Sequence, residues 1–109
     1  MEEDLTFVWG TQMPIMSKDY VQFNCRAKAS YRILIDSLKN IWTEQMAMNF
    51  ENEMIKVVNS YFNEVLNGSN TYNEILSKLN NDSFINYYKN SSCAAQFEII
   101  SIEFITNNC

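Results

Sequence analysis

Apolar residues in the first half of the chain recur at steps of three and four. From Ser17 onward, the positions are Tyr20, Phe23, Ala27, Tyr31, Leu34, Leu38 and Ile41. This spacing is typical of an amphipathic helix. Ser17 is placed to cap the first turn, and Asp19 follows where the helix dipole favours a negative charge. The pattern predicts a helix over residues 17–41.

A second periodic set follows and includes Phe50, Met54, Val57, Val58, Tyr61, Val65 and Leu66. At about 100° per residue, its stripe lies about 150° around the axis from the first. Two helices divided within residues 43–49 would let both stripes meet, and one kinked helix over residues 17–66 stays open as the alternative. Asn49 is the expected N-cap of the second helix, and Gly68 is the expected left-handed residue at its end.

Two shorter helices are expected next. Thr71 and Glu74 have the spacing of a capping box, in which each side chain binds the other residue's free amide. The run 80–82 interrupts this third helix, and Ser83 is expected to cap one or two further turns through Tyr88.

The end of the chain predicts a strand over residues 96–106, because β-branched and aromatic residues alternate there with polar ones. The alternation slips once at Ile99-Ile100, which indicates a bulge or a strand covered on both faces. A strand needs a partner for its amides, and the other strand-like segment covers about residues 4–9. We therefore expect these terminal strands to pair, or else the C-terminal strand to join a sheet in another chain. The expected fold is one mostly helical α+β domain over residues 1–109, with three to four helices and this small sheet.

Composition argues against catalysis. The chain has no histidine and only two glycines, yet 47% of its residues are hydrophobic and 14% aromatic. Histidine-based triads and histidine zinc sites are thereby excluded. Gly10 and Gly68 are isolated and do not form a phosphate-binding loop. Glu51 and Glu53 fit favourable charges at a helix start better than a catalytic pair. We expect no enzyme activity, cofactor or metal.

Cys25, Cys93 and Cys109 lack the close spacing of metal ligands, and their odd number suits reduced thiols in a cytoplasmic protein. A disulfide involving Cys93 stays open as an alternative.

The acidic residues 2–4 stand where a secretory signal would be basic, and no apolar run is long enough to span a bilayer. The net charge of −5 disfavours nonspecific binding to nucleic acid or to anionic lipid. The sequence therefore predicts an intracellular protein that does not bind membranes.

Two groups of residues are candidate contact sites. On the predicted first helix, Lys28, Arg32 and Lys39 fall within about 40° of one another. This basic stripe fits a phosphate or an acidic partner, or else a solvated face balanced by neighbouring acids. Residues 46–50 at the expected helix junction are rich in methionine and aromatic side chains, types enriched at interfaces. The candidate partner-binding residues are Trp42, Met46, Met48 and Phe50, and an ordinary buried corner is the alternative.

Abundant contact residues without a catalytic set favour a protein-binding module. We expect a small acidic adaptor, inhibitor or complex subunit, of a kind that viruses and phages encode. Nucleic-acid association through the basic stripe and carriage of an apolar ligand are the alternatives. Self-association into a homo-oligomer is also expected to be feasible, because a second copy can cover an open strand edge.

Overall fold

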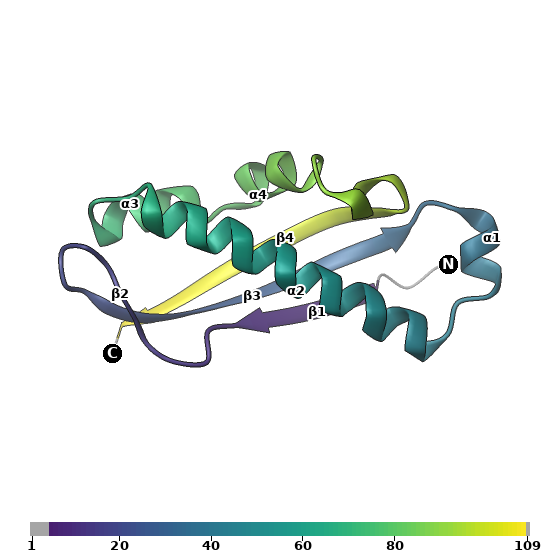
Figure 1. Ribbon diagram of the computed structural model, residues 1–109, viewed down its shortest axis with the longest axis horizontal. Helices are drawn as coiled ribbons and strands as arrows, with labels where there is room; N and C mark the ends of the chain where they lie inside the picture. The colour runs from purple at the N-terminus through teal and green to yellow at the C-terminus, as the bar shows by residue number, and fades with distance from the viewer. Residues whose placement is uncertain (1–4, 109) are drawn as a thin grey trace.

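The structure is a computed structural model that describes residues 5–108 (Figure 1). The start of the predicted N-terminal strand at residue 4 and the thiol of Cys109 lie outside the described residues. In chain order the elements are β1 (Leu5–Gly10), β2 (Ile15–Met16), β3 (Gln22–Ile33), α1 (Asp36–Asn40), α2 (Glu44–Asn67), α3 (Tyr72–Lys78), α4 (Asn81–Tyr88), a 3-10 turn (Ser92–Ala95) and β4 (Phe97–Asn108). The predicted α+β class, with four helices and both terminal strands in one antiparallel sheet, is confirmed.

The long strand β3 forms the centre of the sheet. β4 pairs antiparallel along one side of β3, from Phe23 opposite Asn108 to Ile33 opposite Phe97. β1 pairs antiparallel along the other side, and the short β2 continues that side opposite Phe23. The two terminal strands therefore join one sheet, but each pairs with β3 and not with the other. The sequence analysis missed β3 as the strand between them.

The prediction of a helix over residues 17–41 is wrong. Along β3, every second residue from Phe23 to Ile33 is buried, and the residues between them are exposed or half-buried. A spacing of four residues fits both a helix face and a strand face, so Phe23, Ala27 and Tyr31 alone could not separate the two. Before β3, the φ angle of Tyr20 is 66°, in the left-handed region that a right-handed helix excludes. Residues 17–66 therefore form neither one kinked helix nor the expected two helices. They contain the strand β3, followed by α1 and α2.

Ser17 lies in the turn between β2 and β3. Its hydroxyl hydrogen-bonds to the Asp19 carboxylate and accepts a hydrogen bond from the backbone N–H of Val21 at 3.0 Å. Polar side chains of this kind favour turns because they satisfy local backbone groups. The residues predicted to begin a helix therefore stabilise a hairpin connection.

The predicted second helix is present as α2, which begins six residues earlier than the expected N-cap at Asn49 allows. The Thr43 side chain caps it by accepting a hydrogen bond from Met46 N at 3.2 Å, and Asn49 lies within the helix. Gly68 follows its last residue, but with φ of −91° it does not adopt the left-handed conformation. The buried face of α2 carries Phe50, Met54, Val58, Tyr61, Phe62 and Val65.

The short helices α3 and α4 are confirmed; the Thr71 cap of α3 is present, and the predicted Ser83 cap of α4 is wrong. Thr71 accepts from Glu74 N at 3.1 Å, but the Glu74 carboxylate accepts from Asn70 N rather than from Thr71 N. The cap of α4 is Asn80, which accepts from the N–H of Ser83. The predicted bulge in β4 is present. Ser30 of β3 lies opposite Ser101, and the next residue, Tyr31, lies opposite Ile99, so Ile100 is the extra residue of β4.

The helices and the sheet share an aromatic core. The Phe50 ring of α2 lies 4.5 Å from the Tyr31 ring and 3.9 Å from the Phe97 ring, which joins α2 to β3 and β4. Trp9 packs on Phe62 at 5.2 Å and thereby holds β1 to α2. The opposite face of the sheet is open, because alternate residues of β1, β3 and β4 are exposed.

Candidate functional site

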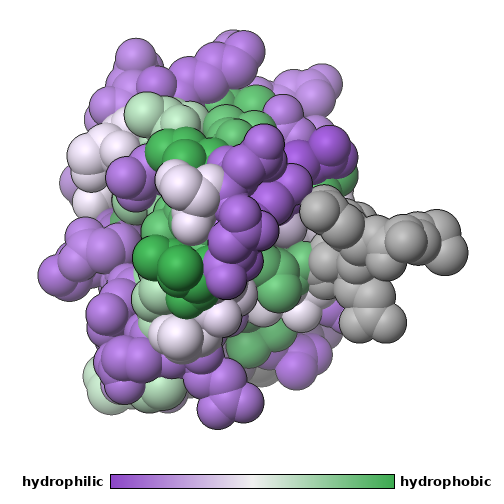
Figure 2. All heavy atoms as spheres, turned by 90° about the vertical axis from the view of Figure 1, so that its right-hand side faces the viewer, coloured by the Kyte–Doolittle hydropathy of each residue, from purple (hydrophilic) through white to green (hydrophobic). Residues whose placement is uncertain are grey.

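The end of the molecule that carries α1 exposes an apolar surface. Leu34 and Ile35 follow β3 directly and are 47% and 38% exposed, and Ile41 after α1 is 64% exposed. Leu38 lies between them, half-buried. Figure 2 views the molecule from this end and shows apolar side chains gathered between polar ones. We call Leu34, Ile35, Leu38 and Ile41 the α1 patch.

The local sequence explains why these side chains stay outside the core. α1 has five residues and none of them is buried, so it serves as a short link that turns the chain from β3 to α2. Asp36 in its first turn and Lys39 in its last turn have the charges that a helix dipole favours. A shallow groove of about 250 Å³ lies between α1 and Gln96. The α1 patch is therefore an apolar surface beside a small groove.

The predicted partner-binding residues do not form one surface. Trp42 is half-buried against the Phe97 ring at 5.6 Å. Met46 is half-buried, and Met48 is 55% exposed. Residues two apart on a helix face different directions, which separates these two methionines. Phe50 is only 5% exposed and lies in the core, so the buried-corner alternative applies to it and it is not available to a partner.

The predicted basic stripe is not a helix face. Lys28 and Arg32 lie on β3, where they share the open face of the sheet with Arg26, and Lys39 lies on α1. The Arg32 guanidinium forms an ion pair with Glu98 of β4 at 3.1 Å. Lys28 lies opposite Glu103, which is also on β4. Acids of β4 therefore accompany the bases of β3, as the solvated-face alternative expects.

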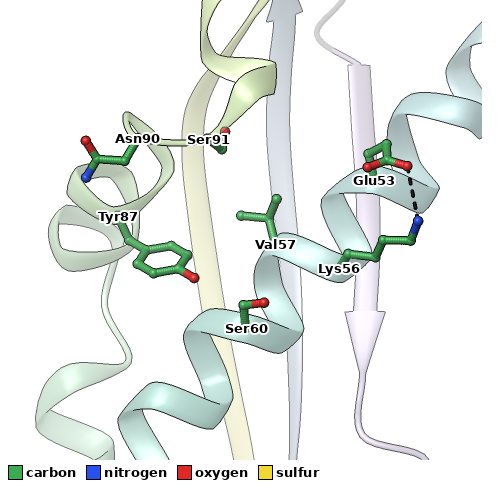
Figure 3. Close-up of a pocket in the computed structure, with 7 residues that line it drawn as sticks. All are labelled: Glu53, Lys56, Val57, Ser60, Tyr87, Asn90 and Ser91. Carbon is green, nitrogen blue, oxygen red and sulfur yellow. Dashed lines mark hydrogen bonds and ion pairs between the residues drawn. The ribbon is translucent and has the colours of Figure 1, made fainter.

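A groove of about 300 Å³ runs between α2 and α4 (Figure 3). Its lining residues are Glu53, Lys56, Val57, Ser60, Tyr87, Asn90 and Ser91. Figure 3 shows Lys56 turned toward Glu53, with which it forms an ion pair at 3.2 Å, and Tyr87 directed toward α2. The Ser91 hydroxyl is buried and has no hydrogen-bond partner among the described residues. Apart from this surface ion pair on α2, the side chains that line the groove are neutral.

The thiols are poorly suited to nucleophilic chemistry. Burial raises the pKa of Cys25 to about 12 and also raises the pKa of Cys93. A raised pKa lowers the fraction of reactive thiolate at neutral pH. Across residues 5–108, no group of three or more cysteine and acidic side chains is placed to hold a metal ion. None of the helices in this range is both long enough and apolar enough to cross a lipid bilayer.

Comparison with family models, with curated proteins and with solved structures found no match for this chain.

The α1 patch is a feature that the sequence analysis missed. Its signal was the run Leu34-Ile35 directly after an alternating segment, which placed two adjacent apolar residues at the end of a strand. The helix assignment hid that signal, because it placed Leu34, Leu38 and Ile41 on a buried face.

Proposed function

We propose that this chain is a non-enzymatic protein-binding module, a small acidic adaptor, inhibitor or complex subunit, and that the α1 patch is its contact surface. The observation that carries this proposal is the exposure of Leu34, Ile35 and Ile41 together at one end of the molecule. Clustered exposed apolar side chains mark interaction sites more often than scattered ones do. The adjoining Trp42 is half-buried, and tryptophan is a frequent anchor in interfaces.

The test compares partner capture by three forms of the purified protein. The wild type, Ile41→Glu and the control Ile105→Glu are each immobilised and exposed to an extract of the native host at near-physiological salt. Ile105 is 43% exposed on the open sheet face, so the control adds the same charge at a distant site. A stoichiometric protein that is retained by the wild type and Ile105→Glu, and lost by Ile41→Glu, supports the proposal. Absence of any stoichiometric partner, or a partner that Ile41→Glu retains, contradicts it.

Nucleic-acid association is the second candidate, and the open sheet face is the observation that favours it. Arg26, Lys28 and Arg32 lie on that face, although Glu98 and Glu103 offset their charge. Binding of this kind weakens steeply with salt, because neutralised phosphates release counterions. A triple Glu substitution of Arg26, Lys28 and Arg32 discriminates the two candidates, since it reverses the charge of the open sheet face and leaves the α1 patch unchanged. The grooves described above are open to solvent, so they give no support to an apolar-ligand carrier, which needs an enclosed cavity.

A further inference from the structure

Helix α2 ends in an asparagine that is followed by glycine. Asn67 is the last residue of α2 and is exposed, and Gly68 follows it directly. Asparagine is a thermally labile residue, because the backbone nitrogen of the next residue can attack the side-chain carbonyl carbon and expel ammonia. Glycine hinders this attack least, since it carries no side chain. The sequence contains one such pair, and it stands at this helix end.

The structure holds the attacking nitrogen away from the side chain. Gly68 N donates a hydrogen bond to the Glu64 carbonyl oxygen at 3.0 Å, which continues the hydrogen-bonding pattern of α2. To reach Cγ of Asn67, this nitrogen must give up that bond and turn out of the helix. The reaction therefore requires a local opening of the last turn of α2, an event that proteins undergo without unfolding as a whole.

Two lysines from other segments hold this last turn closed. Lys18, in the turn between β2 and β3, donates from Nζ to the Asn67 carbonyl oxygen at 2.9 Å. Lys78, the last residue of α3, donates from Nζ to the Gly68 carbonyl oxygen at 2.8 Å. Carbonyl groups at a helix C-terminus lack partners within the helix and attract cations. Figure 1 shows α3 and the connection around β2 beside this end of α2.

Neighbouring contacts fix the same junction. Ser69 is 1% exposed, and its backbone N–H donates to the Leu66 carbonyl oxygen at 3.4 Å. Asp19, in the turn between β2 and β3, accepts a hydrogen bond from Tyr72 N at the start of α3 at 3.0 Å. This turn therefore contacts both helices that meet at the junction. Opening the end of α2 breaks contacts with the turn and with α3 together.

We propose that Asn67 is a site of spontaneous deamidation and that the Lys18 and Lys78 contacts control its rate. In the first step Gly68 N forms a bond to Asn67 Cγ, and the side-chain nitrogen leaves as ammonia, carrying the proton that Gly68 N gives up. The product is a cyclic imide. Water then adds to either carbonyl carbon of the ring, and its remaining proton goes to the nitrogen that is released. One ring opening gives aspartate and the other gives isoaspartate, without oxidation or reduction.

Both products alter the junction. Each adds a negative charge at the C-terminus of α2, where the helix dipole disfavours it. Isoaspartate also routes the main chain through the former side chain, so the Asn67 carbonyl group that Lys18 binds becomes a free carboxylate. The modification accumulates in chains whose α2 end has opened. The junction and α1 lie at opposite ends of the molecule (Figure 1), so the modification leaves the α1 patch unchanged.

The experiment follows conversion of Asn67 by peptide mapping and mass spectrometry at neutral pH, for folded protein and for protein in denaturing urea. The forms are the wild type, Lys18→Met/Lys78→Met and the control Lys56→Met. Methionine keeps an unbranched side chain but donates no hydrogen bond. Loss of two charge-assisted hydrogen bonds is expected to raise the rate in the folded protein at least about tenfold. The control breaks only an ion pair with Glu53 within α2 and is expected to leave the rate unchanged.

Two further measurements separate chemistry from structure. Amide exchange at Gly68 is expected to accelerate in the double variant by the same factor as deamidation, because both require the same opening. Asn67→Gln keeps a side-chain amide and the backbone carbonyl that Lys18 binds, but its ring closure is less favourable, so no conversion is expected at this position. Circular dichroism verifies that each variant is folded. If the double variant is unfolded, each single Met substitution replaces it, with an expected rise of about threefold.

Each contrary outcome overturns the proposal. A folded wild type that converts Asn67 as fast as the protein in urea would show that the helix end does not restrain the reaction. A lysine variant with the wild-type rate would remove Lys18 and Lys78 as its control. Conversion only at other asparagines, with Asn67 intact in the folded double variant, would remove Asn67 as the site. Conversion in the double variant beside a wild type too slow to measure agrees with the proposal.

Discussion

The two sides of β3 end in edges of opposite character. Beyond β4, the Asn81 side chain accepts a hydrogen bond from the backbone N–H of Ile102 at 2.8 Å, and the Tyr88 hydroxyl donates to the Phe97 carbonyl at 2.7 Å. Both caps come from α4. Beyond β1, no comparable cap occurs within residues 5–108. The comparison shows that the helix leading into β4 satisfies part of that strand's edge, whereas no described residue satisfies the outward backbone groups of β1.

The largest expected effect comes from removing the side chain that anchors α4 beside β4. Phe84 is fully buried, and its ring lies 5.3 Å from the Tyr61 ring and 6.1 Å from the Phe104 ring. Phe84→Ala leaves a cavity and should lower the free energy of unfolding by about 3–5 kcal/mol. Urea denaturation measures this change, and amide exchange at Ile102 should accelerate as α4 loosens. The control is Leu76→Ala on α3, where the side chain is 38% exposed. A cost for Phe84→Ala no larger than that of the control would show that α4 does not depend on this anchor.

A second prediction concerns the strand that both edges share. Burial raises the pKa of Cys25 from 9.0 to about 12 and that of Tyr31 from 10.0 to about 12, with a smaller contribution to Tyr31 from the Glu51 charge. Folding therefore favours the protonated, neutral forms. Their contribution to stability is fully present below about pH 9 and is lost as the pH rises toward 12.

Each group should lower the free energy of unfolding by about 1.4 kcal/mol per pH unit between its unfolded and its folded pKa, from pH 9 for Cys25 and from pH 10 for Tyr31. Urea denaturation from pH 8 to pH 11 measures the slope, with Tyr31→Phe as the comparison. The variant should have a shallower slope above pH 10. A wild-type profile that is flat between pH 9 and pH 11 would contradict the assignment. Because β3 pairs with both β1 and β4, probes on the two edges should report the same loss.

The sequence predicted those elements whose apolar residues match either the helical or the strand periodicity, but not both. In β4, six β-branched or aromatic residues between polar ones match only a strand, and α2 carries an apolar stripe too long for a strand. In β3 the decisive residues were Cys25, Ala29 and Ile33, which are buried but are absent from the helical set. Cys25 and Ala29 carry a weak hydrophobic signal, so Phe23, Ala27 and Tyr31, at a spacing of four, suggested a helix. Local pattern therefore determined α2 and β4, and tertiary pairing determined β3.

The candidate sites depended on that assignment. Lys28 and Arg32 were predicted to share a face, and they do, but on a strand and together with Arg26 rather than Lys39. The aromatic residues were expected to contribute to a contact surface. The structure buries or half-buries both tryptophans and most of the tyrosines, with Tyr20 at 83% exposure as an exception. An open strand edge is a property of tertiary pairing, and no residue pattern in β1 specifies which of its sides β3 will occupy.

The third prediction compares the edges one side chain at a time, beginning with the edge that α4 covers. Asn81→Ala removes the acceptor for Ile102 N, and Tyr88→Phe removes the donor to the Phe97 carbonyl. Each substitution leaves a partly or fully buried backbone group without its partner, and should lower the free energy of unfolding by about 1–2 kcal/mol. The matched control is Tyr87→Phe, which removes a hydroxyl from the α2–α4 groove. Equal effects of Tyr87→Phe and Tyr88→Phe would show that the cap on β4 adds nothing.

On the β1 edge the corresponding change is expected to be nearly silent in the isolated molecule. Val8 contributes an exposed side chain, and its backbone groups point away from β3 because they alternate along β1 with those of Phe7 and Trp9. Val8→Lys therefore removes no contact on which the monomer depends. At low protein concentration, its free energy of unfolding should stay within about 0.5 kcal/mol of the wild type. Under the same conditions, amide exchange should be faster at Thr6, Val8 and Gly10 than at Phe7 and Trp9, whose N–H groups face β3. A cost for Val8→Lys as large as that for Asn81→Ala would mean that the β1 edge is already covered within one chain, and the contrast between the two edges would then be false.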